Sequence, residues 1–203
     1  MSLLATVYRQ FQQPTGLLGR FVAWILANRP SNIERSRWTV DLLNVQPGDH
    51  VLEIGFGPGL AIAQVAGLAP QGRIVGVDHS ALMVDRASRR NRRAIDAGLV
   101  ELKVGGFELL PQLGEVFDTV FSVNVLQFFR ERSAVLQTIR SVLKPGGLVA
   151  TTVQPRQRGA TAEDAQAFAR ALSQEMIEAG FREVTVRELD LEPVPAVCVL
   201  ARK

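Results

Sequence analysis

Val-Leu-Glu-Ile-Gly-Phe-Gly-Pro-Gly, residues 51–59, is a short apolar run that ends in three glycines at alternate positions. An apolar run of this length bounded by turn residues is typical of a buried strand. Glycines at every second position let the chain turn sharply and bring bare backbone close to a ligand. They also present backbone N–H groups at the start of a following helix. The stretch therefore predicts a strand, a ligand-binding turn and a helix.

Short apolar runs and helical patterns alternate along the rest of the chain. The predicted strands span 73–78, 100–104, 117–123 and 147–153, and the predicted helices span 60–68, 81–97, 133–143 and 162–179. This alternation implies crossover connections and a parallel sheet covered by helices on both faces. At the end, 183–191 and 194–201 follow each other across a short Glu192-Pro193 break, which predicts an antiparallel hairpin. We therefore expect a three-layer α/β fold, mostly parallel with an antiparallel C-terminal hairpin.

Residues 1–45 read as helices, so we divide the chain into an N-terminal helical cap (1–45) and a sheet domain (46–203). With 203 residues, 47% hydrophobic and 21% charged, the composition is that of an ordinary globular protein. The longest apolar stretch, 17–27, is interrupted by Arg20 and is too short to span a membrane. No secretory leader is recognisable and a single cysteine excludes an internal disulfide, so we expect a cytoplasmic protein. Contact of 17–26 with a membrane surface stays open as an alternative.

The charge balance disfavours nucleic acid as a partner. There are 23 basic and 20 acidic residues, giving a formal net charge of +3, which is too mild to indicate nucleic-acid binding. The densest basic cluster would be spread around a helix and contains no aromatic residue for base stacking, so a solvated helix face is favoured; it comprises Arg86, Arg89, Arg90, Arg92 and Arg93. No tight Asp/Glu group stands at a strand end, so no metal site is expected.

A carboxylate closes the second predicted strand. Asp78 stands where it could accept both hydroxyl hydrogens of a ribose held over the glycine turn. The alternative is that Asp78 only caps the helix after Ser80. The dinucleotide pattern of three spaced glycines fails because Leu60 or Ile62 stands at its last position, so a nicotinamide dinucleotide is disfavoured. His79 could contact a base or be an exposed wall residue.

These segments, with Gly-Val-Asp-His-Ser at 76–80, Phe-Asp-Thr-Val at 117–120 and Leu-Lys-Pro-Gly-Gly at 143–147, resemble the successive motifs of class I S-adenosylmethionine-dependent methyltransferases. The resemblance covers roughly residues 45 to 203. It is greatest to the small-molecule branch that includes the quinone-biosynthesis type. It implies a Rossmann-like sheet, S-adenosyl-L-methionine as cofactor and methyl transfer to a small-molecule acceptor. A non-catalytic cofactor-binding or regulatory protein on the same fold is the alternative.

The resemblance also implies roles for single residues. Glu53 would orient the glycine turn and the methionine ammonium, Asp78 would hold the ribose, and the backbone of Asn124 would lie near the methionine moiety. After the third strand the family usually has an acidic residue for the adenine amino group, but this chain has Gly106; Phe107 could flank the adenine and Glu108 could substitute. The expected cofactor-binding residues are Glu53, Gly55, Phe56, Gly57, Gly59, Asp78, His79, Gly106, Phe107 and Asn124.

A sulfonium is a good leaving group, so the protein mainly has to place the acceptor in line with the methyl group. If a general base is needed, Tyr8, His79 and Glu108 are available and none is singled out. No Pro-Cys pair and no Asp/Asn-Pro-Pro-Tyr signature is present, which leaves a small organic acceptor, and Cys198 is expected in the core. Aromatic residues could form a lid over the acceptor or belong to the core; they are Tyr8, Phe11, Phe21, Trp24, Trp38, Phe128 and Phe129.

Overall fold

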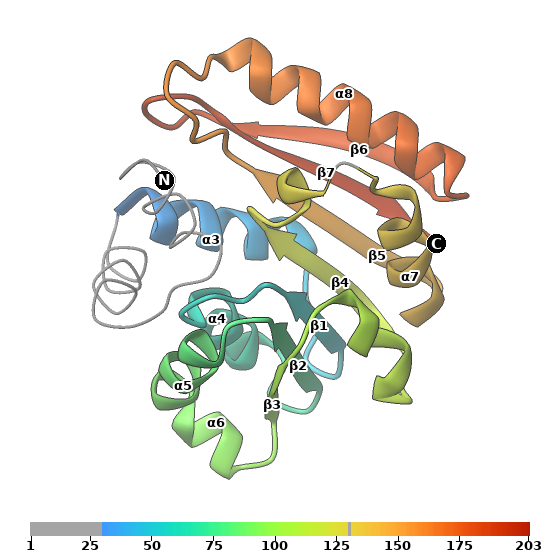
Figure 1. Cartoon of the computed structure of the whole chain (residues 1–203). Helices are drawn as coiled ribbons and strands as arrows, with labels where there is room; N and C mark the ends of the chain where they lie inside the picture. Colours follow the sequence, from blue (N-terminus) through green and yellow to red (C-terminus); the bar gives the residue numbers. More distant parts are fainter. Residues whose placement is uncertain (1–29, 130) are drawn as a thin grey trace.

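The computed structural model describes residues 30–129 and 131–203, and Figure 1 shows their arrangement. The expected helices before residue 30, with Tyr8, Phe11, Phe21 and Trp24, lie outside the described residues. The elements are α3 (Pro30–Leu43), β1 (His50–Ile54), α4 (Leu60–Leu68), β2 (Arg73–Asp78), α5 (Ala81–Arg90), α6 (Arg92–Asp96), β3 (Val100–Val104), η1 (Phe107–Leu113), β4 (Phe117–Val123), η2 (Leu126–Phe128), α7 (Ser133–Val142), β5 (Leu143–Val153), α8 (Ala162–Glu178), β6 (Arg182–Leu189) and β7 (Ala196–Arg202).

The strands form one seven-stranded sheet in the order β3-β2-β1-β4-β5-β7-β6. The pairs from β3 to β5 are parallel, whereas β7 is antiparallel to both β5 and β6. This confirms the mostly parallel sheet with an antiparallel C-terminal hairpin. The hairpin enters the sheet with its second strand, so β7 separates β5 from β6. Strand order reverses between β1 and β4, where the carboxyl ends of an open parallel sheet leave room for a ligand.

Helices cover both faces of the sheet, which confirms the three layers (Figure 1). Along β1 the side chains alternate between two cores, because successive side chains of a strand point to opposite faces. Val51 packs with residues of α3, α4 and α5, whereas Leu52 packs with residues of η1, α7 and α8. Cys198 is fully buried in the first of these cores, as expected, and burial raises the pKa of its thiol to about 12.

The structure differs from the sequence prediction at two elements. The single helix expected over 81–97 is two helices, α5 and α6, that meet at Asn91. The Asn91 amide donates to Ala87 O (2.9 Å) and to Gly59 O (3.2 Å). A side chain that bonds backbone carbonyls in this way competes with the regular helix. The last parallel strand begins at Leu143 rather than at 147, with an irregular register against β4.

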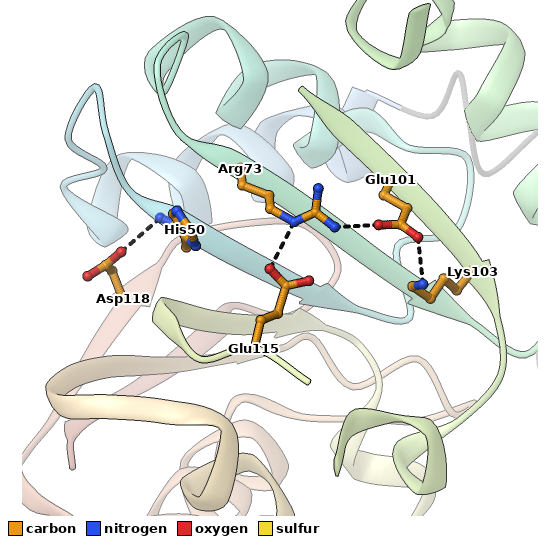
Figure 2. Close-up of polar contacts among 6 residues, drawn as sticks. All are labelled: His50, Arg73, Glu101, Lys103, Glu115 and Asp118. Carbon is orange, nitrogen blue, oxygen red and sulfur yellow. Dashed lines mark hydrogen bonds and ion pairs between the residues drawn. The ribbon is translucent and has the colours of Figure 1, made fainter. Parts of the chain in front are cut away.

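A polar network made of two separate groups of residues lies near the amino ends of β1 to β4, opposite the carboxyl ends of these strands (Figure 2). Arg73 bridges Glu101 (2.5 Å) and Glu115 (2.8 Å). Asp118 accepts hydrogen bonds from the His50 backbone N–H (2.8 Å) and from Lys144 Nζ (2.7 Å). Part of the network is exposed to solvent, so each ion pair contributes little by itself. Its effect is to fasten the starts of neighbouring strands together.

The pKa of Asp118 makes this network sensitive to acid. Burial alone would raise the pKa, but the hydrogen bonds from Lys144 and from the His50 N–H lower it overall. A lowered folded-state pKa adds stability above the unfolded-state pKa, and that stability is lost as pH falls through the folded-state pKa. Asp118→Asn should therefore reduce the free energy of unfolding near neutral pH by up to about 1 kcal/mol. Urea denaturation at several pH values measures this difference.

The difference between wild type and Asp118→Asn should shrink toward zero as the carboxyl group of Asp118 becomes protonated. Asp96→Asn is the control, because it removes an exposed carboxylate on α6 and leaves every contact of Asp118 in place. A constant difference between wild type and Asp118→Asn at every pH would contradict the electrostatic explanation.

Within residues 30–129 and 131–203, no helix has both the length and the apolar character needed to cross a bilayer.

Candidate functional site

The candidate site lies at the carboxyl ends of β1, β2, β3 and β4, which are neighbours in the sheet. The glycine turn follows β1, Asp78 closes β2, Gly106 follows β3 and Asn124 follows β4. The parallel sheet thus brings residues that are far apart in the sequence to one edge. This is the edge at which the order of the strands reverses.

The three glycines after β1 all have positive φ, at 70°, 52° and 74° for Gly55, Gly57 and Gly59. Such values favour glycine, but the space around each differs. A Cβ on Gly55 would lie 2.4 Å from Val125 Cγ2, and one on Gly59 would lie 2.6 Å from Asn91 Nδ2. A Cβ on Gly57 would meet no atom of the described residues within 4 Å. Gly55 and Gly59 therefore permit close packing, whereas Gly57 leaves open space beside the turn.

Asp78 fastens the glycine turn to the end of β2. Its Oδ2 accepts from Gly57 N (2.8 Å) and its Oδ1 from Ser80 N (2.9 Å), so it contacts both the turn and the start of α5. Burial raises its pKa, while these two hydrogen bonds and His79 act in the opposite direction. Each carboxylate oxygen can accept a second hydrogen bond. The side chain can therefore hold the turn and accept from hydroxyl groups of a ligand at the same time.

Glu53 is a buried carboxylate at the end of β1, with 3% of its surface exposed. Burial raises its pKa well above the usual value, the charge of Asp78 adds to this, and a hydrogen bond from the Ile62 backbone opposes it. Among the described residues, its Oε2 has no hydrogen-bond partner. Buried polar atoms nearly always have a partner. A carboxylate oxygen in this position is suited to a cationic or hydrogen-bonding group of a ligand.

Phe56 lies within this turn and His79 directly follows Asp78, and their side chains are in different environments. The Phe56 side chain is buried in the core, where its ring packs so close to Gly76 that a Cβ there would lie 2.6 Å from it. Its backbone is thus the part that belongs to the turn. His79 is exposed, with its Nδ1 3.8 Å from Asp78 Oδ1. The imidazole therefore lies at the solvent-exposed border of the candidate site.

The segment after β3 combines bare backbone with an aromatic pair. Gly106 N donates to Glu108 Oε1 (2.8 Å), so the carboxylate of Glu108 curls back over Gly106. Phe107 packs edge to face against Phe129, with ring centroids 5.0 Å apart. Phe129 belongs to the segment after β4, so this aromatic pair joins the ends of two strands. The Glu108 carboxylate and a half-buried aromatic ring are thus both present where the methyltransferase resemblance predicts an acidic residue.

Asn124, the first residue after β4, adopts a left-handed backbone with φ 57°. Its Oδ1 accepts from Gln154 N (2.8 Å), and its backbone N–H donates to Thr152 O (2.8 Å), so both bonds fix Asn124 against the end of β5. Arg132 holds the rest of this segment through two hydrogen bonds of 2.6 Å to Glu175 and one of 3.1 Å to Phe129 O.

Gln154 is a residue that the sequence reasoning missed. It directly follows β5, is fully buried, and accepts at Oε1 from Arg35 Nη1 (2.6 Å) and Arg156 Nη2 (2.7 Å). A polar residue immediately after a predicted strand was the available signal, since Asn124 occupies the same position after β4. The two arginines had no such signal, because their meeting depends on how α3 packs against the end of β5.

Comparison with known proteins identifies the family. Residues 51–147 match a family described as a methyltransferase domain. The uncharacterized methyltransferase YdaC of Bacillus subtilis is 32% identical over 168 residues, which cover 83% of this chain and 91% of YdaC. The demethylmenaquinone methyltransferase of Symbiobacterium thermophilum is 34% identical over 103 residues, but the match covers 50% of this chain and 41% of that protein.

Solved structures share the fold. The N-methyltransferase NodS of Bradyrhizobium japonicum, in complex with S-adenosyl-L-homocysteine, has a TM-score of 0.69 at 18% identity, over 89% of this chain and 91% of that one. A SAM-dependent methyltransferase from Aquifex aeolicus has a TM-score of 0.68 at 19% identity, over 87% and 94% of the two chains.

Proposed function

Because the chain belongs to the class I S-adenosylmethionine-dependent methyltransferases, we propose that it transfers a methyl group to a small organic acceptor at the carboxyl ends of β1, β4 and β5. Its cofactor is S-adenosyl-L-methionine. Family membership favours an enzyme over the non-catalytic binding protein that the sequence left open. The partial similarity to a demethylmenaquinone methyltransferase supports a quinol as an acceptor to test.

Two observations support the assignment of the site. The buried Oε2 of Glu53 has no hydrogen-bond partner among the described residues, and Gly57, in the turn that follows, borders space that no described residue fills. In this proposal Glu53 accepts from the methionine ammonium, directly or through water, and Asp78 accepts from the ribose hydroxyls. Gly57 lets the cofactor approach the backbone, with Gly55, Phe56 and Gly59 completing the turn.

The other expected cofactor-binding residues contact the adenine and the methionine moiety of the cofactor. Phe107 flanks the adenine, and the Gly106 backbone lies next to it. Glu108 takes the place of the acidic residue that usually contacts the adenine amino group. His79 lies at the exposed border of the site. The backbone of Asn124 contacts the methionine moiety.

When bound, the cofactor supplies a methyl group on a sulfonium, a leaving group that becomes neutral as the methyl departs. The protein therefore has to orient the acceptor and keep water out of the site. Residues 1–45 are the proposed cap for that purpose. The described part of this cap, α3, contacts β5 and reaches Gln154 through Arg35. We assign no general base, because His79 and Glu108 are exposed and Tyr8 lies outside the described residues.

The test is ligand-dependent stability. At about 100 times the dissociation constant, S-adenosylmethionine or S-adenosylhomocysteine should stabilise the protein by roughly 2.7 kcal/mol. For a chain of this length that corresponds to a rise in Tm of about 5 to 10 °C. NADH should have no such effect. Differential scanning fluorimetry measures all three, and the absence of a shift with both methionine-derived ligands would contradict the proposal.

A further inference from the structure

The junction between α5 and α6 holds the glycine turn through two side chains. Asn91, the residue at which these helices meet, donates from Nδ2 to Gly59 O (3.2 Å). Its neighbour Arg90 donates from Nε to Pro58 O (2.9 Å). Two consecutive carbonyl groups of the turn are therefore bound by two consecutive residues of the junction, which lie 32 positions later in the chain.

The Asn91 side chain does not cap the helix that it precedes. An asparagine just before a helix usually caps it by accepting from the backbone N–H groups of its first turn. Asn91 stands at this position of α6, but its side chain accepts no such bond from the described backbone of α6. Its amide donates instead to Ala87 O (2.9 Å) in α5 and to Gly59 O. Capping of α6 therefore does not explain this side chain, and one of its two contacts is with the glycine turn.

The contact between the junction and the turn is close and buried. Asn91 is 5% exposed. A Cβ on Gly59 would lie 2.6 Å from Asn91 Nδ2 and 2.8 Å from Ala87 Cβ, so the absence of a side chain on Gly59 lets α5 come this near. Gly59 O also accepts from Ala63 N (3.3 Å), a bond at the start of α4. Asn91 thus helps to fix the carbonyl group at which α4 begins.

The glycine turn depends on contacts from outside it. Gly59 is the N-cap residue of α4, with φ 74° and no side chain to cap the helix. Glycines lose more conformational freedom on ordering than any other residue, so a turn with three of them is costly to hold in one conformation. Asp78 holds the turn at Gly57 N (2.8 Å), and the junction holds it at Pro58 O and Gly59 O. The two sets of contacts act on successive residues of the turn.

The start of α4 also supports the buried carboxylate of the site. The Ile62 backbone hydrogen-bonds to Glu53, whose Oε2 has no hydrogen-bond partner among the described residues. Because Ile62 lies in the first turn of α4, a shift in the start of α4 would also move the donor of this hydrogen bond. Asn91 is therefore linked through Gly59 to both the glycine turn and Glu53.

We propose that Asn91 is a positioning residue for the cofactor, an inference that rests on the cofactor site of the proposed function. It does not contact the cofactor. By binding Gly59 O, it keeps the turn in the conformation in which Gly57 borders open space. Arg90 assists at Pro58 O. Binding to a turn that is already ordered avoids the entropic cost of ordering it, and this is the physical source of the gain in affinity.

The first experiment uses Asn91→Asp, which keeps the shape of the side chain but removes the amide donor. Calorimetric titration should show an affinity for S-adenosylhomocysteine reduced about tenfold or more, and urea denaturation measures the stability of the same samples. Gln137→Glu is the matched control, because Gln137 Nε2 donates to Ala179 O (3.4 Å) just after α8. It should lose stability as well but bind S-adenosylhomocysteine as the wild type does.

Hydrogen exchange of single amides, measured by NMR on the ligand-free protein, reports the turn directly. In Asn91→Asp the Gly57 N–H should exchange about tenfold or more faster relative to the Val120 N–H, which lies in the central strand β4. A merely structural role would speed exchange at Val120 at least as much as at Gly57. Gln137→Glu should leave the ratio of the two rates unchanged or lower it.

Arg90→Met is a second variant, and it keeps the proposal testable if Asn91→Asp does not fold. Arg90 is exposed, so its loss should leave the fold intact, while the bond to Pro58 O disappears. The affinity for S-adenosylhomocysteine should fall about threefold. Arg93→Met removes the same charge from an exposed position on α6 and should bind normally.

The outcomes separate this proposal from the proposed function. Failure of the wild type to bind S-adenosylhomocysteine would refute the proposed function itself. Normal binding by the wild type, with equal affinity in Asn91→Asp or an equal loss of affinity in Gln137→Glu, would refute only the positioning role. If Asn91→Asp does not unfold cooperatively, Arg90→Met decides, and wild-type affinity in that variant would overturn the proposal.

Discussion

Gly57→Val should abolish measurable binding of S-adenosylhomocysteine while the protein still unfolds cooperatively. Gly57 has φ 52°, and a Cβ there meets no atom of the described protein within 4 Å. The space that a valine side chain would fill is the space in which the cofactor is proposed to approach the backbone. We expect a loss of affinity of at least about a hundredfold, since the side chain blocks the approach and shifts the Gly57 N–H. Calorimetric titration and thermal melting by circular dichroism measure the two quantities.

The control for this variant is Gly114→Val. Gly114 also has positive φ, 70°, and a Cβ there would likewise meet no described atom within 4 Å, but it lies between η1 and β4. Both substitutions cost about 1 to 2 kcal/mol of backbone strain. Gly114→Val should lower the Tm to a similar extent and bind S-adenosylhomocysteine normally. If Gly57→Val also binds normally, the glycine turn is not the cofactor site.

Glu53→Gln should stabilise the ligand-free protein at neutral pH and at the same time weaken cofactor binding. Burial, followed by the charge of Asp78, raises the pKa of Glu53 in the folded state. A carboxyl group with a raised folded-state pKa stabilises the fold at low pH, and this contribution is lost as pH rises through that pKa. Above it, the ionised side chain lowers the free energy of unfolding. Glutamine keeps the shape of the side chain without the charge.

The two effects of Glu53→Gln are measured on the same samples. Urea denaturation across about pH 5 to 9 should show a gain in stability for the variant that grows with pH. Calorimetry should show an affinity for S-adenosylhomocysteine reduced about tenfold or more, because the acceptor for a cationic ammonium has lost its charge.

Glu101→Gln is the matched control for the stability effect. Hydrogen bonds from Lys103 and Arg73 lower the pKa of Glu101, although burial opposes them; the hydrogen bond from Lys103 has the largest effect. Removing its charge should therefore reduce stability at neutral pH and leave cofactor binding intact. Destabilisation by Glu53→Gln at neutral pH, or unchanged affinity, would contradict the role assigned to Glu53.

Local sequence patterns predicted most of the strands and helices that surround the candidate site. The predicted spans of β2, β3, β4 and α4 agree with the structure, because short apolar runs bounded by turn residues define buried strands locally. The break at Asn91 was not predictable in this way. It depends on a contact between the Asn91 amide and Gly59, which lies 32 positions earlier in the chain.

By itself, the sequence determined the three-layer α/β class, the antiparallel ending and the strand ends that carry Glu53, Asp78 and Asn124, since these follow from residue order and periodicity. Only the tertiary structure decided that β7 lies between β5 and β6, that Gly57 rather than its two neighbouring glycines borders open space, and that Arg35 meets Arg156 at Gln154. These features depend on contacts between segments far apart along the chain, and local propensity carries no information about which distant surfaces pack together.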